Sequence, residues 1–467
     1  MRVNLVSLGC AKNLVDGETM LGLLCSQGHE LAGSPELADV VLVNTCGFVL
    51  PAQKESVDTI LEFAALKRDG LLRYLVVTGC LAQRSADELV AEIPEIDAIL
   101  GTGSIEQVGA AFEALEALDR RVGGLDREAL RFVGEAGHVP AGVLPRVQTT
   151  PPWTAYLKIS EGCDNRCRYC VIPALRGPHR SRSAADLLDE VRGLTATGTK
   201  EIVLIGQDLT RWGQDLAGGP ASLASLLADL SELPGVEWLR LQYLHPARVG
   251  SELLQAMAQL PKVCKYLDLP VQHGDDAVLA AMGRETTAAE LLDTVALARR
   301  LMPEVAIRTS FIVGFPGETS TAFAAAMSFL RRLAPDWTAV FAYSRETGTP
   351  AATMTPQVPA RSKIRRRAEM LSLARRLSRR RNRDFVGRKL RVLVETGVHL
   401  VDWAGGRQLP AVSGRSERDA PGVDGQVHIA VPEGAAPPEP GTFLLVEITA
   451  AGAYDLYGRP ASAQPSA

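Results

Sequence analysis

Three cysteines in one short segment carry the strongest chemical signal in the chain. Cys163, Cys167 and Cys170 follow the spacing CxxxCxxC, directly after an apolar run, 156–159, that predicts a buried strand. A cubane iron–sulfur cluster takes four ligands, so three cysteines leave one iron open to bind another molecule. Structural zinc usually takes four Cys or His ligands, and no fourth candidate lies close in sequence. The pattern therefore favours a [4Fe–4S] cluster over zinc.

A second set of three cysteines lacks local spacing but shares a position in the expected fold. Cys10, Cys46 and Cys80 each follow an apolar run that predicts a buried strand, and each has a glycine as an immediate neighbour. Ligands of parallel α/β folds gather beyond the carboxyl ends of the strands, so these cysteines are expected to meet at one edge. They predict a shared metal site with one open iron, although buried free cysteines are common. Cys25 and Cys264 have no such pattern and are expected to be core or surface thiols.

The elements that position these cysteines alternate between strand-like and helix-like stretches. Residues 1–118 predict a parallel α/β domain with helices on both faces of its sheet, whose strands are 3–7, 40–44, 74–78 and 98–100. Residues 119–150 are rich in Gly and Pro and are expected to form a linker. Residues 151–360 predict a partial TIM-like (β/α)6 barrel, with an open doubly wound sheet as the alternative. Its strand candidates are 156–159, 202–205, 238–242, 266–269, 306–313 and 338–341.

Two segments of opposite charge follow the expected barrel. Residues 361–388 are expected to form a basic helical connector, because 361–391 holds 14 Lys or Arg against 2 acids. Residues 389–460 predict a small all-β barrel, and 461–467 are expected to be disordered. From residue 392 to the end there are nine acids against four Lys or Arg, about −5 in total. We expect this acidic domain to attract a basic protein rather than nucleic acid, through Asp402, Glu417, Asp419 and Asp424.

The whole-chain composition narrows the class of protein. The 467 residues are 46% hydrophobic and 22% charged, which is typical of a soluble multidomain protein. No signal peptide is visible, and no apolar run reaches the ~20 residues that span a bilayer, so we expect a cytoplasmic protein without a membrane partner. Reducing compartments rarely keep disulfides, so the cysteines are expected to be ligands.

The first cysteine motif resembles that of the radical S-adenosylmethionine superfamily, including the aromatic residue, Tyr169, before the last cysteine. The resemblance implies that S-adenosylmethionine binds the open iron and is cleaved there to a 5′-deoxyadenosyl radical. Residues after the expected strands are then candidate cofactor contacts, although Gly and polar residues there could simply form turns. The candidates are Tyr169, Gly206, Gln207, Asp208, Asp268, Gln272 and Gly314. His245 and His273 are expected to be ordinary polar loop residues rather than bases.

Nearly the whole chain resembles the methylthiotransferase family in three parts: an N-terminal cluster domain, a radical core and a C-terminal barrel of the TRAM type. The segments 7–13, 44–49 and 78–84 carry the N-terminal resemblance. It implies that Cys10, Cys46 and Cys80 hold a second [4Fe–4S] cluster, at which one S-adenosylmethionine methylates a bound sulfur. A second molecule supplies the radical at the other cluster. No catalytic acid or base is assigned, because the hydrogen to be removed is not appreciably acidic.

Within this family the motifs resemble the RimO branch, which thiomethylates the β carbon of an aspartate in the twelfth small-subunit ribosomal protein. Residues 10–16 resemble its signature, with Ala11 where Pro is usual, and Gly17 stands where Ser is frequent. The implied partners are this basic protein, on or off the ribosome, a sulfur donor, and a reductant such as flavodoxin or ferredoxin. RNA contact through 361–391 is a further possibility. The alternatives are the branch that modifies transfer RNA adenosine, and a non-catalytic iron–sulfur protein that binds ribosomes.

Overall fold

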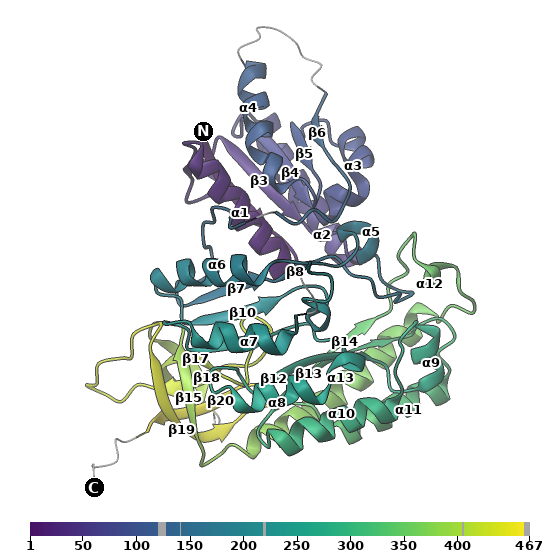
Figure 1. Cartoon of the computed structure of the whole chain (residues 1–467), viewed down its shortest axis with the longest axis vertical. Coiled ribbons are helices and arrows are strands. Elements are labelled where there is room, and N and C mark those ends of the chain that lie inside the picture. The colour runs from purple at the N-terminus through teal and green to yellow at the C-terminus, as the bar shows by residue number, and fades with distance from the viewer. Residues whose placement is uncertain (120–127, 141, 218–220, 404–405, 462–467) are drawn as a thin grey trace.

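The computed structural model shows three domains in the order expected from the sequence (Figure 1). It describes residues 1–467 except 120–127, 141, 218–220, 404–405 and 462–467. The expected disordered tail therefore lies outside the described residues, apart from Ala461, as does part of the expected linker. In Figure 1 the N-terminal domain lies at the top, the core below it, and the C-terminal domain at the lower left. No helix among the described residues has the length and apolar character needed to cross a membrane.

The N-terminal domain is a six-stranded parallel sheet with the order β2-β1-β3-β4-β5-β6. The expected strands are β1 (Arg2–Ser7), β3 (Val40–Thr45), β4 (Tyr74–Gly79) and β5 (Ala98–Leu100). Edge strands β2 (Glu30–Leu31) and β6 (Leu130–Phe132) were not expected, and β6 comes from the expected linker. One face of the sheet is covered by α1 (Ala11–Ser26) and α4 (Val108–Asp119), and the other by α2 (Leu50–Arg68) and α3 (Cys80–Glu92). Cover on both faces explains why β3 and β4 are buried along their whole length.

The core is a partial barrel of six parallel strands in sequence order. They are β7 (Thr154–Lys158), β10 (Glu201–Ile205), β11 (Trp238–Leu241), β12 (Tyr266–Gln272), β13 (Ala306–Val313) and β14 (Trp337–Ala342). Between β11 and β12 the ladder is reduced to a parallel bridge, Leu239 to Val263, and a hydrogen bond from Leu244 N to Asp268 O of 3.0 Å. The strand order never reverses, as it would in a doubly wound sheet. The barrel expectation is therefore confirmed, and the open-sheet alternative is wrong.

Helices follow the barrel strands as expected. They are α6 (Ala184–Ala196), α7 (Leu223–Glu232), α8 (Ser251–Gln259), α9 (Asp276–Ala281), α10 (Ala288–Leu301) and α11 (Ser320–Leu333). The loop after β7 contains a short hairpin of β8 (Ser160–Glu161) and β9 (Arg180–Ser181), with α5 (Ile172–Arg176) between its strands. The small helix α12 (Pro350–Thr353) follows β14.

The expected basic helix is α13 (Ala360–Arg383), which packs against β14 and α11. Its expected apolar stripe faces the core, where Met370 and Leu373 are buried. Arg375, Arg379 and Arg383 are exposed. Four-residue spacing places these three arginines on one face of the helix.

The C-terminal domain is the expected all-β barrel. Its strands are β15 (Lys389–Val394), β16 (His399–Trp403), β17 (Arg407–Ser416), β18 (Val427–Ala430), β19 (Phe443–Ala451) and β20 (Leu456–Pro460). The order β15-β19-β20-β18-β17 closes on itself because β15 also pairs with β17, and β16 extends the edge of β17. Closure satisfies the strand edges that an open sheet would expose.

This barrel packs against the N-terminal ends of the core strands. Arg415 reaches Glu201, at the start of β10, with Nη2 to Oε2 at 2.5 Å, and Arg240 reaches the same carboxylate at 2.8 Å. Tyr266, at the start of β12, donates its hydroxyl to Asp424 at 2.7 Å. Trp337, at the start of β14, donates its indole N–H to the Arg418 carbonyl at 3.0 Å. The domain therefore closes the end of the barrel opposite the strand C-termini.

These contacts overturn part of the expectation drawn from charge. The side chain of Asp424 is 1% exposed and also accepts from Arg308 Nε at 3.2 Å, and burial raises the pKa of Asp424 to about 6. Asp419 is buried as well and accepts from the Ser416 hydroxyl at 2.7 Å. The expectation that both acids face a basic partner is therefore wrong, because they serve contacts inside the protein. Asp402 is exposed.

Candidate functional site

The N-terminal cysteines meet at one edge of the sheet, as their positions predicted. Cys10 and Cys46 follow β1 and β3, and Cys80 is the first residue of α3, directly after β4. These strands are neighbours in the order β1-β3-β4. Burial, together with the neighbouring thiols Cys80 and Cys10, raises the pKa of Cys46 to about 11. Against burial, the charges of Lys12 and Arg176 lower the pKa of Cys10.

Two glycines allow the backbone to approach this closely. Gly9 has φ +92°, and a Cβ on it would lie 2.9 Å from the Cβ of Cys46. A Cβ on Gly47 would lie 2.7 Å from the Cys80 carbonyl oxygen. Real Cβ atoms essentially never approach other atoms so closely. These two glycines are therefore part of how the three thiols come together.

The core cysteines lie in the loop after β7, at the C-terminal end of the barrel strands. Cys163 N donates to the Gly177 carbonyl at 3.0 Å, which fixes the start of the loop. Burial raises the pKa of Cys170 to about 12. Arg284 donates from Nη1 to Cys167 Sγ at 3.6 Å. A buried guanidinium beside a sulfur suits a thiolate ligand, which gains from hydrogen-bond donors around it.

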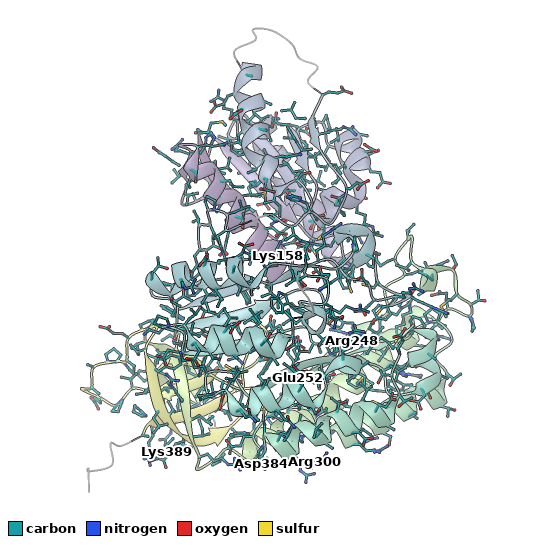
Figure 2. All side chains as sticks on the ribbon, viewed as in Figure 1. Lys158, Arg248, Glu252, Arg300, Asp384 and Lys389 are labelled. Atoms are coloured by element: carbon teal, nitrogen blue, oxygen red, sulfur yellow. The ribbon has the colours of Figure 1, made fainter. Side chains whose placement is uncertain are left out.

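A buried network of charges joins the two sets of cysteines. Arg176 donates from Nε to Cys80 Sγ at 3.3 Å, and from Nη1 to Asp16 Oδ2 at 2.7 Å and Glu161 Oε2 at 3.0 Å. Lys158 donates to the same two carboxylates, with a distance of 2.8 Å to Glu161. Although burial opposes it, the charges of Arg176 and Lys158 lower the pKa of Glu161 to about 2. Figure 2 places Lys158 at the junction between the N-terminal domain and the core.

The network brings the two sets of cysteines to one junction. Arg176 is the last residue of α5, the five-residue helix that follows Cys170. Val171, the residue before that helix, and Leu175 within it pack against Cys80. The five-residue helix after the core cysteine Cys170 therefore contacts the N-terminal cysteine Cys80.

The spacing of the thiols bears on the zinc alternative. Among the described residues, no three His, Cys, Asp or Glu side chains are close enough together to hold a single metal ion. A zinc ion holds thiolates at about 2.3 Å, which brings their sulfurs within about 4 Å of one another. A cubane binds each thiolate through a separate iron, so its ligands lie farther apart. Among the described residues, the arrangement therefore gives no support to a single zinc ion.

Two of the candidate cofactor contacts hold the cysteine loop in place. Asp208 is fully buried, and its Oδ2 accepts from Asn165 Nδ2 at 2.8 Å and from Arg248 Nη2. Asn165 lies between the first two core cysteines, so Asp208 anchors the loop to the end of β10. Gln207 donates to Glu161 at the start of the same loop. Against burial, Arg248 lowers the pKa of Asp208, which therefore stays charged.

Tyr169, Gly314 and Gly206 lie where the chain is closely packed. The Tyr169 ring makes an edge contact with Phe315, at 6.5 Å between centroids, and Phe315 follows Gly314. Gly314 has φ +75°, a conformation that few other residues adopt. A Cβ on Gly206 would lie 2.6 Å from the hydroxyl of Ser160, so Ser160 packs directly against the backbone there.

Asp268 is hydrogen-bonded within the core, and Gln272 has a strained backbone conformation. Asp268 accepts from the backbone N–H of Tyr243 at 3.0 Å and from Arg308 Nη1 at 3.3 Å. Gln272 has φ +70°, which is strained for a residue with a side chain. In the described part of the chain, no hydrogen bond joins Asp268, Gln272 or Gly314 to any of the six cysteines. Their contact with a cofactor stays a prediction.

The two histidines lie in loops, as expected, and both are buried. Burial, reinforced for His245 by the charges of Arg284 and Arg248, lowers the pKa of His245 to about 3. Burial lowers the pKa of His273 to about 4. Both rings are therefore neutral at physiological pH.

The sequence predictions missed the charged residues that surround the cysteines. Lys12 lies within the first N-terminal motif, two residues after Cys10, and Arg176 lies six residues beyond Cys170. Lys158 interrupts the apolar run that predicted the strand β7. A charged residue inside a predicted buried strand was the one signal that pointed to a buried partner.

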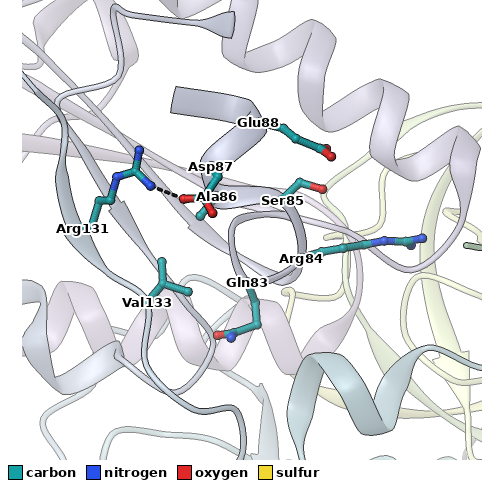
Figure 3. A pocket seen from close by; sticks show the side chains of 8 residues that line it. All are labelled: Gln83, Arg84, Ser85, Ala86, Asp87, Glu88, Arg131 and Val133. Atoms are coloured by element: carbon teal, nitrogen blue, oxygen red, sulfur yellow. Dashed lines mark hydrogen bonds and ion pairs between the residues drawn. The ribbon is translucent and has the colours of Figure 1, made fainter. Parts of the chain in front are cut away.

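A surface hollow of about 420 Å³ lies beside α3 in the N-terminal domain (Figure 3). Arg131 and Asp87 form an ion pair across it. Gln83 accepts from Thr102 N at 3.0 Å and donates to the Gly134 carbonyl at 3.1 Å. The polar groups of Gln83, Asp87 and Arg131 are therefore already paired within the protein.

Comparison with known proteins places the chain in a family. Residues 2–101 match the uncharacterised protein family UPF0004, 157–330 the radical SAM superfamily, and 386–460 the TRAM domain. A protein of Desulforudis audaxviator named ribosomal protein uS12 methylthiotransferase RimO is 47% identical over 464 residues, which cover 99% of this chain and 98% of the relative. The chain belongs to the RimO family. The Geobacter sulfurreducens protein of the same name is 43% identical over 457 residues, covering 98% of each chain.

A solved structure supports the fold alone. The structure of the radical S-adenosylmethionine methyltransferase TsrM from Kitasatospora setae has a TM-score of 0.55 at 16% identity, covering 75% of this chain and 73% of that one. The resemblance to the methylthiotransferase family, and to its RimO branch, is confirmed by the relatives of the RimO family.

Proposed function

We propose that this protein transfers a methylthio group to the β carbon of an aspartate in ribosomal protein uS12. The relatives of the family carry that name, and the junction between the domains supports the assignment for this chain. The observation on which the proposal mainly rests is the hydrogen bond from Arg176 to Cys80. It links the N-terminal thiols to the core loop that follows Cys170. In the proposed reaction both sets of cysteines serve chemistry at the same carbon atom of the substrate, so the two sets must lie close together.

We infer that each set of three cysteines holds a [4Fe–4S] cluster, and that S-adenosylmethionine binds at the core set. When bound, these groups would supply the transferred sulfur and the radical chemistry that can remove hydrogen from an unactivated carbon. The chain's own residues position and shield them. Arg176 and Arg284 direct N–H groups at cysteine sulfurs, and Asp208 anchors the core loop. Burial at the junction excludes water from the reaction.

The partners follow from this reaction. The protein needs the ribosomal protein as substrate, a reductant of the flavodoxin or ferredoxin type and a sulfur donor, and we place it in the cytoplasm with the ribosome. The exposed arginines of α13 support an additional contact with RNA. Among the described residues, no ion pair is found for Arg375, Arg379 or Arg383. Guanidinium groups bind phosphates well, so these arginines suit ribosomal RNA beside the substrate.

Anaerobic reconstitution tests the clusters and their roles. The wild-type protein should bind about eight irons per chain, because two cubanes contribute four each. Cys163→Ala should keep about four irons and lose S-adenosylmethionine cleavage. Cys46→Ala should also keep about four, retain cleavage and lose methylthio transfer. Cys25→Ala is the matched control and should behave as wild type. About four irons in the wild-type protein would contradict the assignment of two clusters.

Mass spectrometry separates the substrate classes. A strain without this gene should contain unmodified uS12 and normally modified transfer RNA. The reverse result would assign the protein to the branch that modifies transfer RNA.

A further inference from the structure

Lys12 is a buried cation next to the N-terminal cysteines. It lies in the first turn of α1, two residues after Cys10, and is 8% exposed. Its ammonium lies over the ring of Tyr243, 3.4 Å from the ring centroid. Within the ranges that the structure describes, no carboxylate oxygen lies within 4.0 Å of Lys12 Nζ.

Three other buried cations of this junction are paired with acids. Lys158 and Arg176 share Asp16 and Glu161. Arg146, on the segment that crosses from one domain to the other, pairs with Glu18 and Glu190. Buried charges normally have a partner, because taking an ion out of water is costly. Lys12 departs from that rule at the place where the substrate must arrive.

The position of the ammonium is fixed from both domains. Ala11 and Val15 flank Lys12 on α1 and pack against the end of β10, at Val203 and Ile205. Tyr243 follows β11 and has φ +66°, a strained conformation for a residue with a side chain. The carboxylate of Asp268 holds it there by accepting its N–H at 3.0 Å. The strained backbone at Tyr243 therefore places its ring under the Lys12 ammonium.

We propose that Lys12 binds the carboxylate of the substrate side chain, and that Tyr243 holds the ammonium in position. The inference rests on the proposed function, in which the reacting carbon is bonded to that carboxyl group. An ammonium has three N–H donors, and its contact with the ring leaves donors free for carboxylate oxygens. Because Lys12 lies two residues from Cys10, a carboxylate bound to it lies beside the N-terminal thiols. The site selects an acidic side chain and gives no such partner to a neutral base.

Binding of the holoenzyme to uS12 tests this role without relying on turnover. The two probes are labelled uS12 and its variant with Asn in place of the target Asp, measured by fluorescence anisotropy. Losing one partner of a buried charge pair usually weakens binding by about thirtyfold or more. Lys12→Gln should therefore weaken binding of Asp-uS12 by about that factor and leave Asn-uS12 nearly unchanged.

Two further variants separate charge from fold. Lys12→Arg should restore part of the preference for Asp, because it keeps a cation at the site. Lys54→Gln changes an exposed lysine of α2 in the same domain and should leave both affinities as in wild type. The iron content of each variant is measured in parallel.

The alternative is that Lys12 serves only to balance the charge of the Cys10 thiolate. In that case Lys12→Gln lowers iron content or shifts the cluster midpoint potential, while the ratio of Asp to Asn affinities stays at the wild-type value. That result, or an equal weakening of both probes, would overturn the proposal. Failure of the wild-type enzyme to modify uS12 at all would instead refute the proposed function.

Discussion

Arg176 allows the junction between the domains to be tested with a single substitution. Arg176→Met keeps a long unbranched side chain but removes the charge and all N–H donors. Asp16 and Glu161 would then share Lys158 alone, with side chains that are 6% exposed. The hydrogen bond to Cys80 would also be lost.

The magnitude follows from the carboxylates that remain. The pKa of Glu161 is lowered from 4.5 to about 2 although burial raises it, and each pKa unit is worth about 1.4 kcal/mol, so the charged form of this carboxylate is stabilised by a net of about 3 kcal/mol in the folded protein. Removing one partner of a buried ion pair typically costs about 3 to 5 kcal/mol. We expect Arg176→Met to lower the free energy of unfolding by about 3 kcal/mol at pH 7. Because the folded pKa is lowered, this contribution is present above about pH 4.5 and is lost as the pH falls toward 2.

Urea unfolding followed by fluorescence measures the loss, and a double-mutant cycle identifies its origin. Arg176→Met combined with Asp16→Asn should lose less than the sum of the two single variants, because the second change removes one stranded charge. Arg192→Met is the control. Arg192 pairs with Asp189 on the surface, where both side chains are more than half exposed, and should cost less than about 1 kcal/mol.

Two results would refute this account of the junction. One is a loss for Arg176→Met no greater than that of the surface control. The other is strict additivity in the cycle, which would mean that Arg176 and Asp16 stabilise the protein independently.

Two further predictions concern other parts of the chain. Burial raises the pKa of Glu201, but Arg415 and Arg240 outweigh it and lower the pKa to about 2. Glu201→Gln should therefore reduce the thermal stability of the protein at pH 7 and differ less from wild type below about pH 4.5, as calorimetry can show; a pH-independent difference would contradict this. Changing Arg375, Arg379 and Arg383 to Gln should reduce the salt slope of ribosomal RNA binding by about 2 to 3, measured by anisotropy, and an unchanged slope would exclude this surface.

The strands and the positions of the cysteines could be predicted because they depend on local patterns. Residues 40–43 form a continuous apolar run, and the structure buries the whole strand 40–45. The cysteines follow such runs directly, so parallel strands had to bring them to one edge of the sheet. Six consecutive strand–helix units favoured a barrel, but the open sheet stayed as an alternative because both folds have the same alternation of strands and helices. Strand order decides it, and strand order is a tertiary property.

The charged partners could not be predicted because the sequence does not say which charges are buried. Arg176 and Asp16 are 160 positions apart, and neither lies in a pattern that implies the other. Asp424 illustrates the opposite error. Counted as a surface charge, it contributed to an expected acidic face, yet it pairs with Arg308 inside the protein. A net charge per domain treats every ionised residue as exposed, and fails where domains pack through ion pairs.

The C-terminal barrel has a consequence for where the chain can be divided. It supplies Arg415 to Glu201 and a carbonyl to the indole of Trp337, and it covers Trp238 with Phe443. A chain ending after α13 would remove the Arg415 partner of Glu201. It would also expose the indole rings of Trp238 and Trp337 at the N-terminal end of the core strands. The boundary that is clear in the sequence is therefore not a boundary of folding. Exchange of this module between relatives would require matching changes in the first residues of the core strands.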